Sequence, residues 1–111
     1  MRAPLKVVVV GAGRGLSQVR SIRRLSDFLQ LVAWVDLDLA RLHSRIDEAG
    51  LSRDLASPSL DSTLTTTDCD AVVVATWARS HEEVVGQALD AGKHVLVEKP
   101  YALTLATSRA L

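Results

Sequence analysis

The chain has 111 residues, the length of about one domain, and 13 Lys and Arg residues balance 13 Asp and Glu residues. A formal net charge of zero gives no electrostatic attraction to nucleic acid or to an anionic membrane surface, so neither partner is expected. The one cysteine, Cys69, excludes an internal disulfide and favours a cytoplasmic setting, and no apolar run approaches the roughly 20 residues of a membrane helix.

Short apolar runs predict the strands of a parallel sheet. In chain order they cover residues 7–10, 31–35, 71–75 and 95–97, and a weaker strand is expected at 54–56. The four strong runs are continuously apolar and do not alternate with polar residues. Continuous apolarity indicates burial on both faces, which is typical of a parallel sheet covered by helices.

Stretches with helical period separate these runs. Apolar residues recur every three or four positions in the first two: Leu16, Val19, Ile22 and Leu25, then Leu39, Leu42, Ile46 and Ala49, with Gly50 as a stop. A short helix is expected after Pro58. The next helix is predicted to start at a capping box of Ser80 and Glu83 and to end at Gly92, and a last one to begin at Thr104.

This alternation of strands and helices predicts an α/β fold with a doubly wound parallel sheet of the Rossmann type. The expected strand order is 3-2-1-4-5, with helices stacked on both faces by right-handed crossovers. Residues 1–111 would then form one dinucleotide-binding domain that ends within its last helix.

A glycine-rich turn, Gly11-Ala12-Gly13-Arg14-Gly15, links the first strand to the first helix. A dinucleotide pyrophosphate needs backbone N–H groups at a helix N-terminus with no side chain in the way, so these residues are candidate cofactor contacts. In the regular G-x-G-x-x-G pattern the third glycine would stand at position 16, which is Leu16. Either the loop is one residue shorter than usual or Gly15 has a different role.

Asp36 closes the second strand, 25 residues after Gly11. This is near the spacing of about 20 residues at which an acidic side chain binds the adenosine ribose. The alternative is that Asp36 only caps the next helix. Leu37 and Asp38 follow, with no arginine to bind a 2′-phosphate, so NAD is expected in preference to NADP.

The second half of the chain carries a more specific pattern. Residues 70–76 read Asp-Ala-Val-Val-Val-Ala-Thr, and residues 91–100 read Ala-Gly-Lys-His-Val-Leu-Val-Glu-Lys-Pro. With the glycine loop, these segments resemble the Gfo/Idh/MocA family, named for glucose–fructose oxidoreductase and inositol dehydrogenase. The resemblance covers essentially the whole chain.

The resemblance implies roles for several residues of this half. Thr76 and the loop to His81 would lie along the cofactor. Lys99 would be catalytic, reaching the nicotinamide and the reacting oxygen of the substrate, with Glu98 as its acidic neighbour in the cofactor site. Trp77 stands where the family usually has proline, so either the loop is reshaped or Trp77 stacks against the cofactor or a domain partner.

The function implied is an NAD(P)-dependent oxidoreductase that moves hydride between nicotinamide and a hydroxyl or carbonyl carbon of a sugar, cyclitol or related small molecule. Family members continue into a second domain that contacts the substrate. That domain is expected to be absent from this chain, and the 111 residues alone are expected to be inactive. Two alternatives stay open: a stand-alone, non-catalytic dinucleotide-binding or redox-sensing module, and a domain for another nucleotide or coenzyme A.

The remaining candidates have simpler interpretations. His81 and Glu82 do not form a zinc motif, because the second histidine of that motif is missing at position 85, and no metal is expected. Cys69 is predicted to be structural and Trp34 to pack in the core. The exposed edge of the fifth strand favours a homo-oligomer.

Overall fold

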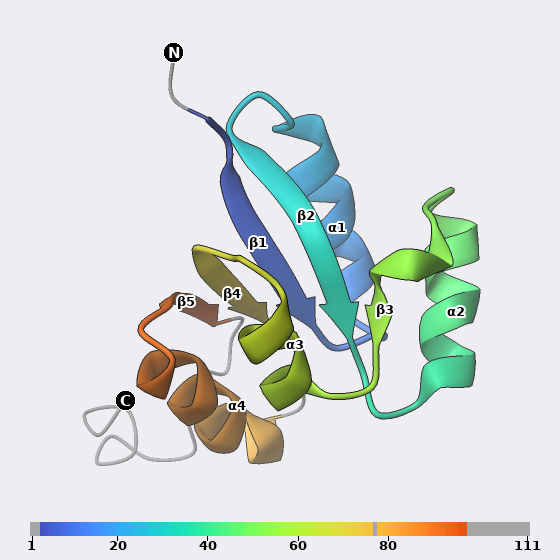
Figure 1. Ribbon diagram of the computed structural model, residues 1–111. Helices are drawn as coiled ribbons and strands as arrows, with labels where there is room; N and C mark the ends of the chain where they lie inside the picture. Colours follow the sequence, from blue (N-terminus) through green and yellow to red (C-terminus); the bar gives the residue numbers. More distant parts are fainter. Residues whose placement is uncertain (1–2, 77, 98–111) are drawn as a thin grey trace.

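The computed structural model describes residues 3–76 and 78–97, and Figure 1 shows their arrangement. Along the chain lie β1 (Leu5–Val10), α1 (Gly15–Arg24), β2 (Leu29–Val35), α2 (Leu39–Glu48), the 3-10 turn η1 (Arg53–Leu55), β3 (Ala56–Ser57), α3 (Leu60–Thr66), β4 (Ala71–Val74), α4 (Ala78–Asp90) and β5 (His94–Val97). The strands form one parallel sheet in the order β3-β2-β1-β4-β5. The predicted α/β class and strand order are confirmed.

Helices cover the sheet on two faces, and each face has its own apolar core (Figure 1). Val7 and Val9 of β1 pack with residues of α1 and α2, whereas Val8 and Val10 pack with residues of α3 and α4. Successive side chains of a strand point to opposite faces. Because both faces of β1 are buried, every one of these four positions is apolar, which accounts for the continuous run in the sequence.

Two glycines end helices as predicted. Gly50 after α2 and Gly92 after α4 have φ angles of 71° and 75°, in the left-handed region that side chains rarely adopt. The following N–H group of Lys93 donates back to the carbonyl of Ala88, and that of Leu51 donates to the carbonyl of Ile46. Both helices therefore end in the Schellman arrangement, which satisfies carbonyls of the last turn.

Helix α4 does not begin where the capping box predicted. It begins at Ala78, so Ser80 lies inside the first turn and does not cap the helix. A capping residue must precede the first helical residue. The spacing of Ser80 and Glu83 matches a capping box, which requires the first helical residue at position 81, but α4 begins three residues earlier, at Ala78.

The third strand is also shifted from its predicted position. Residues 53–55 form the 3-10 turn η1, in which the Ser52 hydroxyl accepts a hydrogen bond from the N–H of Asp54 at 3.2 Å. Only Ala56 and Ser57 then pair with β2. The short helix expected after Pro58 is α3, whereas the helix predicted from Thr104 lies outside the described residues.

Candidate functional site

The sheet has a switch point between β1 and β4. After β1 the chain adds β2 and β3 on one side, and it then returns to place β4 and β5 on the other side of β1. Ligands of doubly wound sheets bind in the crevice outside the carboxyl ends of the strands at such a point. Gly11 follows β1 there, and Ala75 and Thr76 follow β4.

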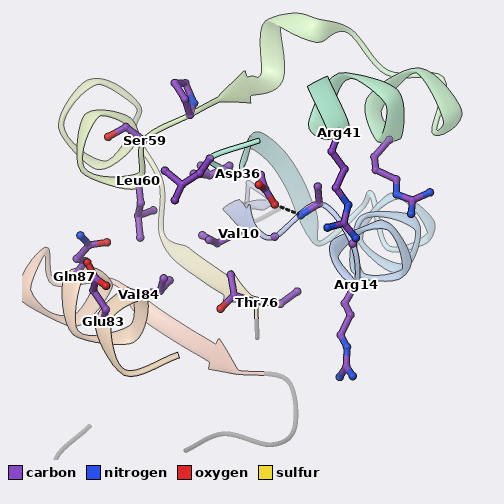
Figure 2. Close-up of a pocket in the computed structure, with 18 of the residues that line it drawn as sticks. Val10, Arg14, Asp36, Arg41, Ser59, Leu60, Thr76, Glu83, Val84 and Gln87 are labelled. Atoms are coloured by element: carbon purple, nitrogen blue, oxygen red, sulfur yellow. Dashed lines mark hydrogen bonds between the residues drawn. The ribbon is translucent and has the colours of Figure 1, made fainter. Parts of the chain in front are cut away.

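A pocket of about 650 Å³ opens at this point, and Figure 2 shows its lining. This volume is in the range that holds a small molecule or cofactor. The lining comes from the ends of β1, β2 and β4 with the loops that follow them, from helix α2, from the start of α3 and from helix α4: Val10, Gly11, Ala12, Gly13, Arg14, Val35, Asp36, Leu37, Arg41, Arg45, Pro58, Ser59, Leu60, Asp61, Ala75, Thr76, Glu83, Val84 and Gln87.

Gly11 allows the loop to leave β1 against the end of β4. Its φ angle is 115°, and a Cβ atom there would collide with the carbonyl oxygen of Ala75. Any other residue would meet both backbone strain and a steric clash. The first glycine is therefore required by the fold of the loop.

The second glycine, Gly13, lies under the side chain of Arg41. A Cβ atom on Gly13 would be 2.6 Å from Nη2 of Arg41. Figure 2 shows the Arg41 side chain reaching from α2 toward the glycine loop. Helix α2 thus brings a positive charge to the rim of the loop, which the sequence pattern did not indicate.

The third glycine of the loop has a packing role. Gly15 is the first residue of α1, and a Cβ atom on it would lie 2.9 Å from Nε1 of Trp34 and 3.1 Å from Cγ1 of Val9. Close packing of helix on sheet is what the third glycine of the regular pattern allows. Of the two alternatives raised by Leu16, the structure supports a loop that is one residue shorter than in the regular pattern. Helix α1 starts at Gly15, and this glycine lets the helix approach the sheet closely.

Asp36 braces the loop from the end of β2. Its Oδ2 accepts a hydrogen bond from the N–H of Ala12 at 2.7 Å, and its Oδ1 accepts one from the N–H of Asp38 at 2.8 Å. The residue that caps α2 is Asp38, which accepts from the N–H of Arg41 at 3.1 Å. The alternative that Asp36 serves only as the helix cap is therefore wrong.

The N-terminus of α1 differs from those of α2 and α3. Asp38 caps α2, and the Ser59 hydroxyl caps α3 by accepting from the N–H of Ser62 at 3.2 Å. In the described part of the chain, Arg14 occupies the N-cap position of α1, and its side chain forms no capping hydrogen bond. Arg14 lines the pocket, and a helix N-terminus without a side-chain cap favours an anion through the helix dipole.

Basic side chains lie on one side of the pocket, and an acidic and an amide side chain lie on the other. Figure 2 shows Arg14 and Arg41 beside the glycine loop, Glu83 and Gln87 on the far side, and Asp36 between them. The basic side chains suit a phosphate. The far side offers hydrogen-bond groups to a less charged portion of a ligand.

The structure describes Cys69 and the part of the chain in which metal ligands can be sought. Cys69 is buried, and burial raises the pKa of its thiol, as expected of a structural cysteine. Over residues 3–76 and 78–97, no cluster of three or more His, Cys, Asp or Glu side chains is placed to hold a metal ion. No helix in the same ranges is long and apolar enough to cross a membrane.

Five of the predicted cofactor contacts line the pocket together: Gly11, Gly13, Arg14, Asp36 and Thr76. Gly15 lies instead at the contact of α1 with the sheet. Trp77, Glu98 and Lys99 lie outside the described residues, and the same holds for the side chain of His81, whose backbone belongs to α4. The predictions for these four residues stay predictions.

The sequence interpretation missed three parts of the site. Trp34, predicted only as core, donates its indole N–H to the carbonyl oxygen of Gly11 at 2.8 Å. Arg41 reaches the loop from α2, and α3 and α4 contribute Ser59, Val84 and their neighbours. Because a buried indole N–H needs an acceptor, a hydrogen bond from Trp34 to a neighbouring segment could have been predicted from the sequence. The residues of α3 and α4 reach the pocket only through the topology of the fold, which local sequence patterns do not reveal.

Comparison with known proteins places this geometry in a family. The model of an oxidoreductase family with an NAD-binding Rossmann fold, GFO_IDH_MocA, matches residues 5–111. The chain is 37% identical over 101 residues to inositol 2-dehydrogenase 1 of Paenarthrobacter aurescens (strain TC1), which covers 90% of this chain and 29% of the relative. It is 36% identical over 108 residues to biliverdin reductase A of Mus musculus, covering 95% and 34%.

A solved structure agrees with these relatives. The crystal structure of myo-inositol dehydrogenase from Lactobacillus casei, in complex with NAD(H) and myo-inositol, matches with a TM-score of 0.84 and 30% identity. The match covers 96% of this chain and 32% of the other. The chain spans about a third of the length of the curated relatives it matches. Because the family model matches nearly all of it, this chain belongs to the Gfo/Idh/MocA oxidoreductase family and forms its NAD-binding Rossmann fold.

Proposed function

We propose that this chain binds NAD(H) in the pocket at the switch point and presents the nicotinamide for hydride transfer to or from a hydroxyl or carbonyl carbon. The observation that carries the proposal is the joint placement of the glycine loop and Asp36, whose Oδ2 lies 2.7 Å from the N–H of Ala12. A glycine loop at a helix N-terminus beside an acidic residue is the arrangement that binds a dinucleotide.

The residues present fit this cofactor. The N–H groups at the uncapped start of α1 would hold the pyrophosphate, with Arg14 and Arg41 as its counter-charges. Asp36 would accept hydrogen bonds from the adenosine ribose. Leu37, 91% exposed at the pocket, and Val84 would supply apolar contacts to the adenine. When bound, the nicotinamide supplies the hydride acceptor or donor.

NAD is proposed over NADP on electrostatic grounds. Asp36 lies directly after β2 and lines the pocket, so a 2′-phosphate placed at Asp36 would meet its carboxylate. Arg41 and Arg45 add positive charge to the pocket wall. Arg41 lies over Gly13, so we assign its charge to the pyrophosphate loop.

The substrate proposed is a sugar, cyclitol or related small polyol. The support is that one relative is an inositol 2-dehydrogenase and that one similar structure contains myo-inositol beside NAD(H). Another relative is a biliverdin reductase, so this fold is compatible with other substrates. Lys99 would hold or move the proton at the reacting oxygen. Its role, the cytoplasmic setting and a homo-oligomeric state stay predictions from the sequence.

A fluorescence titration with NADH tests the proposed cofactor. NADH should bind, and NAD and ADP-ribose should displace it, whereas coenzyme A should not. Displacement by coenzyme A at lower concentration than by ADP-ribose would favour the alternative of another nucleotide ligand.

The 111 residues alone are predicted to produce no steady NADH from NAD and a polyol panel, because losing substrate orientation removes about 7–11 kcal/mol of barrier reduction. Sustained turnover by the pure chain would contradict that prediction.

A further inference from the structure

The indole of Trp34 holds one end of the glycine loop. Trp34 lies on β2, its side chain is fully buried, and its Nε1 donates to the carbonyl oxygen of Gly11 at 2.8 Å. A buried indole N–H requires a hydrogen-bond acceptor. Here the acceptor belongs to the first residue of the loop.

The same indole sets the other end of the loop. A Cβ atom on Gly15 would lie 2.9 Å from Nε1 of Trp34 and 3.4 Å from its Cε2. The start of α1 therefore rests directly on the edge of the indole that bonds Gly11. Two positions further along the chain, Asp36 accepts a hydrogen bond from the N–H of Ala12 at 2.7 Å. Trp34 and Asp36 therefore bond two successive residues of the loop, Gly11 and Ala12.

From these contacts we propose that Trp34 is a positioning residue for the pyrophosphate of the cofactor. By bonding Gly11 and limiting the approach of Gly15, its indole fixes the two ends of the loop and thereby the direction of the N–H groups between them. Gly15, which stands one position earlier than the third glycine of the regular motif, is then required by the indole, because a side chain at position 15 would displace the indole of Trp34. The inference rests on the proposed function.

Trp34 acts through the loop and does not touch the ligand. It is fully buried, and it is not among the residues that line the pocket. A residue that only filled the core would change stability without changing the relative affinity for ligands with and without phosphate. A residue that orients the loop must change that ratio.

The experiment measures the affinity of the chain for NADH, ADP and adenosine, with two variants and one packing control. Trp34→Phe keeps an aromatic ring but removes the indole N–H. Gly15→Ala presses on the indole from the other side, although alanine has the higher helix propensity. Ile46→Ala is the control, because Ile46 is fully buried in the same core and does not line the pocket.

In Trp34→Phe and in Gly15→Ala we expect NADH and ADP to bind about tenfold more weakly, which corresponds to roughly 1.4 kcal/mol, with adenosine changed by less than about twofold. Ile46→Ala should lower the melting temperature at least as much and leave the ratio of ADP to adenosine affinity unchanged. Should Trp34→Phe fail to fold, Gly15→Ala alone carries the test.

The double variant checks that both residues act through one contact. Its NADH affinity should equal that of Trp34→Phe within about twofold, because neighbours that share a contact are not additive. An unchanged ADP to adenosine ratio in both single variants, or a ratio that falls equally in Ile46→Ala, would overturn the inference. If the wild-type chain bound no dinucleotide at all, the proposed function would fail first, and this result is separate from the variants.

Discussion

At each end of the parallel sheet, an aspartate side chain accepts a hydrogen bond from a backbone N–H group, but the surroundings of the two aspartates differ. At the amino end, Asp70 before β4 accepts a hydrogen bond from the N–H of Lys6 at 2.8 Å. At the carboxyl end, Asp36 after β2 accepts one from the N–H of Ala12 at 2.7 Å. Each aspartate ties the strand or loop of β1 to a neighbouring segment, so the backbone contact alone does not distinguish them.

The surroundings of the two aspartates differ. Near Asp70, Nζ of Lys6 lies 2.9 Å from Asp68, and Nζ of Lys93 donates to the carbonyl of Cys69 at 2.8 Å. Asp36 instead borders a pocket of about 650 Å³ beside a helix start that lacks a side-chain cap in the described chain. The candidate site is therefore marked by the pocket and the uncapped helix start beside the carboxylate of Asp36, because a carboxylate bonded to a backbone N–H is present at both ends of the sheet.

Gly11→Ala should have the largest effect, because Gly11 lies at the carboxyl end of β1 in direct contact with the backbone of Ala75. The positive φ and the clash with Ala75 should destabilise the fold by roughly 3 kcal/mol and abolish measurable NADH binding. Gly86→Ala is the matched control, since a Cβ atom there meets nothing within 4 Å inside α4. It should stabilise the chain by about 0.5–1 kcal/mol and bind NADH normally. Chemical unfolding and NADH titration of both variants give the answer, and equal effects would refute this account of the loop.

Replacing each aspartate by alanine separates the two ends directly. Asp36→Ala should weaken NADH binding by about 1–3 kcal/mol, the scale of a hydrogen bond to a charged group. Asp70→Ala should leave the NADH affinity unchanged and lower stability by about 0.5–1.5 kcal/mol, because only the exposed bond to Lys6 is lost. Calorimetric titration measures the first quantity and urea unfolding the second. A similar loss of NADH affinity in both variants would show that the ends do not differ in function.

Arg41→Ala should have a smaller effect, limited to ligands with phosphate. Arg41 is exposed over Gly13, so its loss should weaken NADH and ADP by about 1 kcal/mol, or roughly fivefold, with less dependence of affinity on salt. Arg53→Ala is the control, because Arg53 pairs with Asp47 at 2.6 Å and does not line the pocket. Titrations at low and high salt compare them. Equal losses of affinity would rule out the assignment of Arg41 to the pyrophosphate.

The smallest effect is expected at the amino end and depends on pH. The hydrogen bond from Lys6 lowers the pKa of Asp68 below its ordinary value of 3.8. A carboxyl with a lowered pKa contributes stability above its unfolded pKa, and this contribution is lost as the pH falls through the folded value. Asp68→Asn should therefore lose slightly less stability than the wild type between about pH 5 and pH 3. Both side chains are exposed, so a large difference in urea unfolding would contradict the assignment.

Much of the fold follows from the sequence because burial on both faces leaves a continuous apolar run. The runs at β1, β2, β4 and β5 each marked a strand, and together with the helical periods they predicted the order of the sheet. The third strand was predicted at 54–56, but β3 overlaps that range only at Ala56, since residues 53–55 form the 3-10 turn before it. The start of α4 was also misplaced, because a capping pattern does not exclude an earlier start.

The site was predicted only where local sequence carries it. Gly11, Gly13 and Asp36 are recognised by spacing along the chain, and the structure brings them together. Trp34 and Arg41 escaped prediction because their contacts join β2 and α2 to a loop more than 20 residues away. Such contacts depend on the register of β2 beside β1, which the spacing of motif residues does not reveal.

Calorimetric titration of the wild-type chain with NADH and with NADPH tests whether the pocket binds a dinucleotide and which one it prefers. We expect one NADH to bind per chain, with an affinity at least about tenfold higher than that of NADPH, because the Asp36 carboxylate at the pocket opposes a 2′-phosphate. No binding of either cofactor would contradict the assignment of the pocket to a dinucleotide. Tighter binding of NADPH would contradict the role given to the end of β2.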